Sequence, residues 1–342
     1  MSERGGRITR NLALAGAYGG FGAGVAGGLF AGVLVGQARL ARHTIPRAEA
    51  PPPRSDGRYG TEYPGKPLRM AVLGDSTAAG MGVDRPRDTP AALLACGLAE
   101  RLHRPVLVRN VAVAGSLSAG LVPQRELAIP WRPDVAVILV GGNDVTHRIP
   151  FPVAVGYLAE SVRELRAVGC QVVVGTCPDL GTIRPIQPPL RWLARRWSRQ
   201  LAAAQTYAVV EAGAATVSLA DLVGPTFYAS PGLMFSADRF HPSADGYATA
   251  AAAILPTLIA AAVGPGQEAE EPSRLAGDEG VRSLAQAAVE AADQAGTEVT
   301  AARVAGRERG PAGRWVELRH RVRQLTERRQ DPAATPVPSI VE

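Results

Sequence analysis

The sequence is nearly without lysine: Lys66 is the only one among its 342 residues, so arginine carries the excess of positive charge. A formal net charge of +6 is therefore weak evidence for nucleic acid binding, because an arginine bias can reflect genomic composition. The chain also has no zinc-finger spacing, no aromatic-rich RNA-binding signature and no Lys/Arg block in its central region. We therefore expect no nucleic acid partner.

Cysteine is also scarce, and three residues cannot form a closed disulfide framework. Cys170 and Cys177 flank an expected strand that would hold them roughly 20 Å apart, too far for a disulfide. Nothing in the cysteine spacing resembles a metal site. The sequence therefore predicts free thiols, no metal and no cofactor.

Charge is absent from residues 11–38, while arginines precede the run within residues 1–10 and follow it at Arg39 and Arg42. Twenty-eight helical residues span about 40 Å, which is enough to cross the hydrocarbon core of a membrane with some tilt. We expect a basic N-terminus at 1–10 and a retained transmembrane anchor at 11–38. A cleaved signal peptide is the alternative, although its apolar region usually has only about 7–15 residues.

Glycine recurs at every fourth position of this run, at residues 16, 20, 24, 28, 32 and 36. Small residues at this spacing let two membrane helices approach closely, which makes self-association one expectation and chance accumulation of glycine the other. The run also contains GAGVAG at 22–27. A dinucleotide site is rejected there, because no acidic residue between Glu3 and Glu49 can bind the ribose.

The side of the membrane is left open by the sequence. Arginines flank both ends of the apolar run, so its orientation is poorly specified. The short basic N-terminus favours an extracytoplasmic catalytic domain, whereas the unpaired cysteines favour the cytoplasm.

After a linker at 39–66 that is rich in proline, glycine and charge, short β-branched runs alternate with longer helical stretches. Strands are expected at 68–73, 106–111, 134–140, 171–175 and 216–219, and helices near 90–102, 121–127, 153–168, 190–212 and 243–262. This alternation predicts an α/β domain at 67–263 with a mostly parallel five-stranded sheet covered on both faces. Chemistry in such sheets collects at the carboxyl ends of the strands.

The last part of the chain, 264–342, is a charged tail that we expect to be partly helical. Within 314–329, apolar residues lie at heptad-like spacing and arginines occupy the remaining face. This pattern is typical of a basic amphipathic helix on an anionic membrane or a partner, and equally of a solvated helix in a tail.

Four short polar stretches follow expected strands or precede the last expected helix. They are GDSTAAG with Ser76, NVAVAGS with Gly115, VGGNDVTH with Asn143, and DRFHPSADGY with Asp238 and His241. Taken singly, each has an ordinary reading as a turn, a cap or a loop. Their joint occurrence at the expected carboxyl edge indicates a catalytic site.

A serine hydroxyl needs a base to take its proton, and the imidazole of His241 suits that task near neutral pH. Asp238, three residues earlier, can reach Nδ1 of this ring and fix its tautomer. We therefore expect Ser76, His241 and Asp238 to form a catalytic triad. The backbone N–H groups of Ser76 and Gly115 and the side-chain amide of Asn143 are the candidate oxyanion donors.

The four blocks resemble those of the SGNH hydrolases, also called GDSL-type lipases and esterases. This family is named for a serine, a glycine, an asparagine and a histidine, which match Ser76, Gly115, Asn143 and His241. The resemblance covers roughly residues 68–262. It implies a flavodoxin-like three-layer α/β/α fold and hydrolysis of acyl esters, including lipids, acetylated sugars and thioesters. The anchor and the tail lie outside it.

Three neighbouring side chains, Asp75, Asp144 and His147, are expected to contact the substrate. Asp144 is also suited to order its loop by accepting backbone N–H groups. His147 is an alternative base, although Asp144 is the only acid near it in the sequence.

The segment 178–200, PDLGTIRPIQPPLRWLARRWSRQ, is expected to border the cleft. Its arginines at 184, 191, 195 and 196, with Trp192 and Trp197, fit an anionic or lipid head group. The other interpretation, which we favour, is a cationic surface helix in which Leu193 and Trp197 pack on the sheet.

Three other classes of protein were weighed. An α/β-hydrolase requires G-x-S-x-G, which GDSTA lacks. Metal-assisted hydrolysis is disfavoured because the site has a lone accessible histidine. A membrane-tethered, non-catalytic scaffold with the same fold is the second functional class, and labelling of Ser76 by a fluorophosphonate separates it from a hydrolase.

Overall fold

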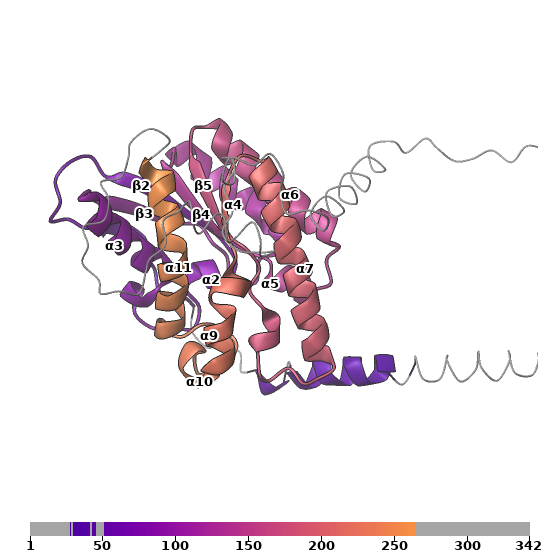
Figure 1. Ribbon diagram of the computed structural model, residues 1–342. Coiled ribbons are helices and arrows are strands. Elements are labelled where there is room, and N and C mark those ends of the chain that lie inside the picture. The colour runs from indigo at the N-terminus through magenta and orange to yellow at the C-terminus, as the bar shows by residue number, and fades with distance from the viewer. Residues whose placement is uncertain (1–27, 29, 42, 46–50, 264–342) are drawn as a thin grey trace, which may run out of the picture.

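The structure, a computed structural model, describes residues 28, 30–41, 43–45 and 51–263 (Figure 1). The predicted basic N-terminus at 1–10, most of the predicted anchor, and the charged tail with its amphipathic pattern at 314–329 lie outside the described residues.

One sheet of six strands forms the centre of the domain, in the order β1-β3-β2-β4-β5-β6. Its strands are β1 (Gly57–Tyr59), β2 (Leu68–Gly74), β3 (Val106–Asn110), β4 (Val135–Leu139), β5 (Gln171–Gly175) and β6 (Ala215–Val217). All neighbours are parallel except β1 and β3. Counted from β2, the parallel strands follow the order 2-1-3-4-5 of flavodoxin-like sheets. The expected mixed α/β class with a mostly parallel sheet is confirmed.

The sheet has one strand more than the five expected. β1 lies inside the predicted linker at 39–66 and pairs antiparallel with β3, Gly57 opposite Val108 and Tyr59 opposite Val106. Its three residues are too few to show an alternation of apolar and polar side chains, which is the signal by which strands are recognised in a sequence.

Helices cover both faces of the sheet (Figure 1). On one face α3 (Pro90–Leu102) packs against α11 (Ala244–Val263), and the other face carries α4 (Leu121–Ala128), α6 (Phe151–Ala167) and α7 (Leu190–Glu211). The side chains of β2 alternate between two buried clusters: Met70 belongs to the cluster with α3 and α11, whereas Leu73 belongs to that with α4 and α6. The register of the strand thus follows from two-sided burial.

Short helices lie in the connecting loops. They are α2 (Ser76–Ala79), η1 (Pro86–Asp88), η2 (Ser118–Gly120), η3 (Ile129–Trp131), α5 (Gly142–Thr146), η4 (Leu180–Thr182), α8 (Leu219–Leu222), α9 (Gly224–Ala229) and α10 (Pro231–Met234). None of these elements was expected from the sequence, because three to six residues are too few to show a helical period.

An apolar helix at Phe30–Ala41 lies against the domain, where Ala41 is buried. Nε2 of Gln37 donates a hydrogen bond to the carbonyl oxygen of Pro188 at 2.6 Å, and Oε1 of Gln37 accepts one from the N–H of Leu190 at 3.1 Å. Arg239 donates to the carbonyl oxygen of Thr44 at 3.0 Å. The predicted boundary at residue 67 therefore excludes residues that contact the domain.

The predicted membrane helix at 11–38 is not confirmed, because most of it lies outside the described residues and the described helix is short. Within the described part of the chain, only α11 is long and apolar enough to cross a membrane by length and composition. This helix packs against α3 and the sheet, as the core helix of a domain does.

Candidate active site

Ser76 lies where β2 ends at the carboxyl edge of the sheet. The strand ends at Gly74, whose φ is +136° and where a Cβ would lie 1.9 Å from the carbonyl oxygen of Leu139, so only glycine fits. The carboxylate of Asp75 then accepts a hydrogen bond from the N–H of Thr77 at 2.9 Å and caps α2. Ser76 is the first residue of α2, where an N–H has no intrahelical acceptor.

A buried glutamine holds this strand end in place. Oε1 of Gln124 accepts from the N–H of Gly74 at 2.7 Å, and its Nε2 donates to the carbonyl oxygen of Gly74 at 2.9 Å. On the neighbouring strand, Nε2 of Gln205 donates to the carbonyl oxygen of Val140 at 2.9 Å, and its Oε1 accepts from the N–H of Cys177 at 2.7 Å. These amides satisfy backbone groups at the points where the strands end.

Asp238 and His241 lie on the loop between α10 and α11. The loop is closed at its base, where the N–H of Ser236 donates to the carbonyl oxygen of His241 at 2.9 Å. At its tip Arg239 adopts a left-handed conformation with φ of +57°, and its N–H donates to the carbonyl oxygen of Ser236 at 2.9 Å. This turn points Asp238 and His241 in the same direction.

The structure brings Ser76, His241 and Asp238 into one chain of hydrogen bonds. Nε2 of His241 lies 3.0 Å from Oγ of Ser76, although 165 positions separate the two residues. Nδ1 of His241 lies 2.6 Å from Oδ2 of Asp238. Oδ1 of Asp238 accepts three further hydrogen bonds of 2.8 Å, from the hydroxyl of Ser236 and the N–H groups of Phe240 and His241.

These contacts hold Asp238 in its charged form. Burial alone raises the pKa of this carboxyl, but the hydrogen bonds from His241, from the N–H groups of Phe240 and His241, and from Ser236 outweigh burial and hold the pKa well below its usual range. An ionised carboxylate only accepts, so Nδ1 of His241 carries the proton. Nε2 is then left with a lone pair that can accept a hydrogen bond from the hydroxyl of Ser76.

Gly82 packs against the loop that carries Asp238 and His241, and no motif in the sequence indicated this contact. Its φ is +99°, and a Cβ at this position would lie 2.9 Å from Cβ of His241 and 2.7 Å from the carbonyl oxygen of Pro242. Nearby, the buried hydroxyl of Tyr247 donates to the carbonyl oxygen of Met81 at 2.6 Å. The GMG triplet at 80–82 is the one sequence feature that could have indicated this close contact, since glycine is common where two backbones approach closely.

The candidate oxyanion donors lie on adjacent loops. Nδ2 of Asn143 donates to the carbonyl oxygen of Ser116 at 3.0 Å, and the N–H of Val113 donates to the carbonyl oxygen of Gly74 at 3.1 Å. These bonds tie the loop of Gly115 to both other loops. Gly115 is exposed with φ of +81°, and no atom lies within 4 Å of where its Cβ would be.

The three residues expected to contact substrate have different environments. Asp75 is in the lining of the pocket described below, and burial raises its pKa to about 6 despite the hydrogen bonds from Thr77. Asp144 is 1% exposed and accepts hydrogen bonds from the N–H and the hydroxyl of Ser118, and burial raises its pKa. His147 is exposed, with Nδ1 2.9 Å from the carbonyl oxygen of Asn143. Neither Asp144 nor His147 is part of the pocket lining.

A mostly apolar pocket opens beside the hydroxyl of Ser76. Ser76, Asn143 and His241 lie in its lining. The rest of the wall is largely hydrophobic and includes Leu180, Ile183, Leu219, Val223, Phe227 and Phe235. No motif in the sequence indicates this pocket, because its walls come from separate short elements that meet only in the fold.

Three arginines of segment 178–200 contact other groups of the protein: Arg184, Arg195 and Arg199. Arg184 donates to the carbonyl oxygen of Tyr228 at 2.9 Å and lies over its ring at 4.4 Å. Arg195 forms an ion pair with Asp179, as does Arg199 from the same helix. Trp197 is half-buried and packs against the core, which agrees with the surface-helix interpretation, whereas Trp192 is 65% exposed. Cys170 and Cys177 are buried free thiols, as expected.

The chain is similar to known acylhydrolases and esterases. A model of the GDSL-like lipase/acylhydrolase family matches residues 72–249. A GDSL-like esterase of Mycobacterium tuberculosis is 42% identical over 257 residues, which cover 72% of this chain and 81% of that protein.

Solved structures with a similar arrangement include esterases. A crystal structure of TesA is 25% identical and covers 56% of this chain and 97% of its own, with a TM-score of 0.46. The acetylxylan esterase Axe2 of Geobacillus stearothermophilus is 19% identical and covers 60% of this chain and 97% of its own, with a TM-score of 0.44.

Proposed function

This chain belongs to the GDSL-like lipase/acylhydrolase family and is an SGNH-type carboxylic ester hydrolase, and we propose that it works through a Ser76–His241–Asp238 triad and an acyl-enzyme intermediate. The single observation that carries this proposal is the hydrogen-bonded chain from Oγ of Ser76 through both ring nitrogens of His241 to Oδ2 of Asp238.

Acylation begins when Oγ of Ser76 attacks the carbonyl carbon of the ester and Nε2 of His241 takes the hydroxyl proton. The ionised Asp238 stabilises the resulting imidazolium through its contact with Nδ1. The tetrahedral intermediate then collapses, and the alcohol leaves with the proton from Nε2. Ser76 is now acylated and the imidazole is neutral again.

Deacylation repeats these steps with water. Nε2 of His241 takes a proton from the water that attacks the acyl carbon, and the same proton returns to Oγ of Ser76 as the carboxylic acid leaves. The proposed oxyanion donors are the N–H groups of Ser76 and Gly115 and Nδ2 of Asn143. The tethering of the Gly115 loop to Gly74 and Asn143 supports this role, since oxyanion donors must be fixed before the charge develops.

Among the residues expected to bind substrate, we assign Asp75 to the floor of the pocket and Asp144 to the support of the Asn143 loop. The hydrogen bonds of Asp144 to Ser118 join that loop to the one that carries Gly115. His147 lies outside the pocket lining and is retained only as a residue of the approach to the site.

A fluorophosphonate probe tests the proposal directly. The wild-type protein is expected to label at Ser76 and to hydrolyse short-chain p-nitrophenyl esters, and Ser76→Ala is expected to do neither. Ser161→Ala is a matched control, because it removes a buried hydroxyl on α6 that is not part of the pocket lining. A wild-type protein that neither labels nor hydrolyses these esters would overturn the proposal in favour of a non-catalytic scaffold.

We also propose that residues 11–38 tether the enzyme to a membrane, with the catalytic domain on the extracytoplasmic side. The support is the charge-free sequence and the contact of the helix at Phe30–Ala41 with the segment around Pro188. Protease treatment of intact cells should digest the domain, and protection of the domain until the cells are lysed would contradict this orientation.

We propose in addition that two copies of the anchor associate through the glycines at 16, 20, 24, 28, 32 and 36. Among the described residues, no atom lies within 4 Å of a Cβ added at Gly28, Gly32 or Gly36, which leaves room there for a second helix. Cross-linking in membranes should yield a dimer that Gly32→Leu weakens, and an unchanged yield would remove the idea.

A further inference from the structure

The pocket beside Ser76 has two facing walls that come from distant parts of the chain. One wall is the η4 segment after β5, which contributes Leu180 and Ile183. The other follows β6 and contributes Leu219 and Val223 from α8 and the residue after it. These four side chains are apolar, although Asp179 and Thr182 of the first wall also lie in the lining, so what they contact best is an apolar group attached to the carbonyl carbon that Ser76 attacks.

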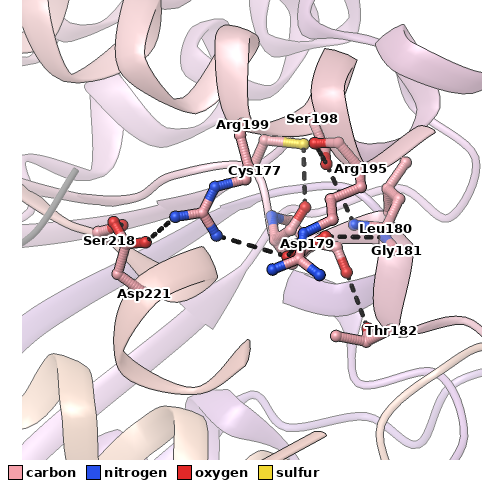
Figure 2. A network of polar contacts seen from close by, with 11 residues as sticks. Cys177, Asp179, Leu180, Gly181, Thr182, Arg195, Ser198, Arg199, Ser218 and Asp221 are labelled. Atoms are coloured by element: carbon pink, nitrogen blue, oxygen red, sulfur yellow. Dashed lines mark hydrogen bonds and ion pairs between the residues drawn. The ribbon is translucent and has the colours of Figure 1, made fainter. Parts of the chain in front are cut away.

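Asp179 fixes the shape of the first wall. Its side chain is 5% exposed, and its Oδ1 accepts a hydrogen bond from the N–H of Gly181 at 2.8 Å. Its carbonyl oxygen accepts one from the hydroxyl of Thr182 at 2.8 Å, and Oγ of Ser198 accepts one from the N–H of Leu180 at 3.2 Å. These bonds hold the η4 turn against α7 (Figure 2).

Arg199, which lies on α7, joins the two walls. Its Nη1 contacts Oδ2 of Asp179 at 3.4 Å, and its Nη2 forms an ion pair with Oδ1 of Asp221 on α8. The other oxygen of Asp221 accepts a hydrogen bond from the hydroxyl of Ser218 at 2.9 Å. Figure 2 shows the guanidinium between the two carboxylates. Arg195 also pairs with Asp179, but no described contact links it to Asp221.

We propose that Arg199 is a positioning residue that sets the acyl-chain preference of the enzyme by holding the η4 and α8 walls of the pocket at a fixed separation. This inference rests on the ester hydrolysis proposed above. It adds that the pocket takes an acyl chain longer than acetyl.

The chemistry of arginine suits this role. The guanidinium is planar and charged at every working pH, and its nitrogens can bind two carboxylates at once in a fixed geometry. Because its side chain is 40% exposed, each ion pair contributes little to stability. Loss of Arg199 should therefore change the spacing of the walls rather than unfold the domain.

The test is the chain-length profile of Arg199→Ala on p-nitrophenyl acetate, butyrate and octanoate. The wild type should prefer the longer esters, since each buried methylene contributes roughly fourfold. In Arg199→Ala the kcat/KM ratio of octanoate to acetate should fall by about five- to tenfold. The loss should appear as a higher KM for octanoate, with kcat/KM on acetate within about twofold of the wild type.

Two neighbours on α7 serve as matched controls. Arg196→Ala removes an exposed arginine for which the described residues provide no ion pair, and it should leave the profile unchanged. Arg195→Ala removes a contact to Asp179 alone and should change the profile less than Arg199→Ala. Arg199→Lys should restore part of the preference, because an ammonium supplies the charge without the planar geometry.

The link to Asp221 is tested by a double-mutant cycle. Asp221→Asn should lower the octanoate preference as Arg199→Ala does, and the double variant should lower it no further, because both changes break the same bridge. An equal loss on acetate and octanoate, an unchanged profile, or additive effects would overturn the proposal. If the wild type hydrolyses all three esters with similar kcat/KM, the proposed acyl pocket is wrong and the esterase function stands. If the wild type hydrolyses none of the esters, the proposed function itself is wrong.

Discussion

The two edges of the pocket each carry a carboxylate that pairs with a cationic or basic side chain, and they differ in how the pair is built. Asp238 contacts a histidine three residues further along the chain. Asp179 contacts an arginine 20 residues further along, which in turn contacts a carboxylate on a third element. The first pair is local in sequence, and the second exists only because the η4 turn packs against α7.

The partners also differ in chemistry. A histidine can gain and lose a proton near neutral pH, so its pairing with Asp238 suits a step in which a proton moves. An arginine keeps its proton at every working pH, so its pairing with Asp179 suits the fixing of structure. We infer that the Asp238 edge supports turnover and that the Asp179 edge supports shape.

The largest expected effect comes from replacing the carboxylate at each edge. Asp238→Asn should lower kcat/KM by roughly 10³–10⁴, because an amide can favour the wrong tautomer of His241. Asp179→Asn should leave kcat/KM on acetate nearly unchanged and lower the free energy of unfolding by about 1–3 kcal/mol, because it weakens the ties of a buried turn. Steady-state kinetics and urea unfolding of both variants check this.

Two results would contradict the inferred difference between Asp238 and Asp179. A large loss of turnover on acetate in Asp179→Asn would mean that both edges serve the chemical step. Retained turnover in Asp238→Asn would mean that the carboxylate is dispensable to His241. Asp245→Asn, an exposed carboxylate at the start of α11, controls for loss of charge near the loop.

A smaller effect is expected from Gly82, which packs against the loop that carries Asp238 and His241. Gly82→Ala should lower kcat by about 10–100-fold, because the new Cβ would displace His241 from Ser76 by a few tenths of an ångström or more. Gly65→Ala is the matched control: its φ of +97° is close to the +99° of Gly82, but no atom lies within 4 Å of the added Cβ.

Both alanine variants should lose some stability from their left-handed backbone, and only Gly82→Ala should lose turnover. Thermal unfolding and kinetics on p-nitrophenyl butyrate separate the two effects. Equal losses of turnover in both variants would show that backbone strain, and not contact with the histidine loop, is responsible.

The difference between contacts that are local in sequence and contacts that depend on the fold explains which features the sequence could predict. The five parallel strands were found because most of them are short apolar runs between helical stretches, and their bounds agree within about two residues. β1 was missed because Gly57–Tyr59 is too short to carry a pattern. The side chains of Ser76, Asp238 and His241 stood in short motifs, and the structure brings them within hydrogen-bonding distance, although their part in turnover stays a prediction.

The pocket walls could not be predicted in this way. Asp179 and Asp221 are separated by 42 positions, and Arg199 between them is one of several arginines in its segment. Nothing in that segment distinguishes the arginine that bridges two walls from Arg196, which does not. Contacts of this kind depend on the packing of η4 against α7 and on the position of Asp221 relative to Arg199, which are properties of the fold and not of a motif.

An effect on stability is expected at Asp75, a buried carboxylate in the pocket lining that accepts a hydrogen bond from the N–H of Thr77. Burial raises its pKa from 3.8 to about 6. Between these values the folded protein binds the proton more tightly than the unfolded chain does, so this group lowers stability as pH rises from about 4 to 6. Asp75→Asn keeps the cap on Thr77 and removes the charge. Its free energy of unfolding should exceed that of the wild type by up to about 3 kcal/mol at pH 7.

Urea unfolding at pH 4, 5, 6 and 7 measures this difference, with Asp84→Asn as an exposed carboxylate from a nearby loop for comparison. If the gain in Asp75→Asn is the same at every pH, the carboxylate carries no buried charge at neutral pH. A gain that grows with pH means instead that the enzyme bears the cost of an unpaired charge beside its nucleophile. The three carboxylates near the pocket would then differ in their partners. Asp238 pairs with a histidine, which suits proton transfer, and Asp179 pairs with an arginine, which suits the fixing of structure. Asp75 accepts a hydrogen bond from a backbone N–H, so its negative charge lowers the stability of the folded protein.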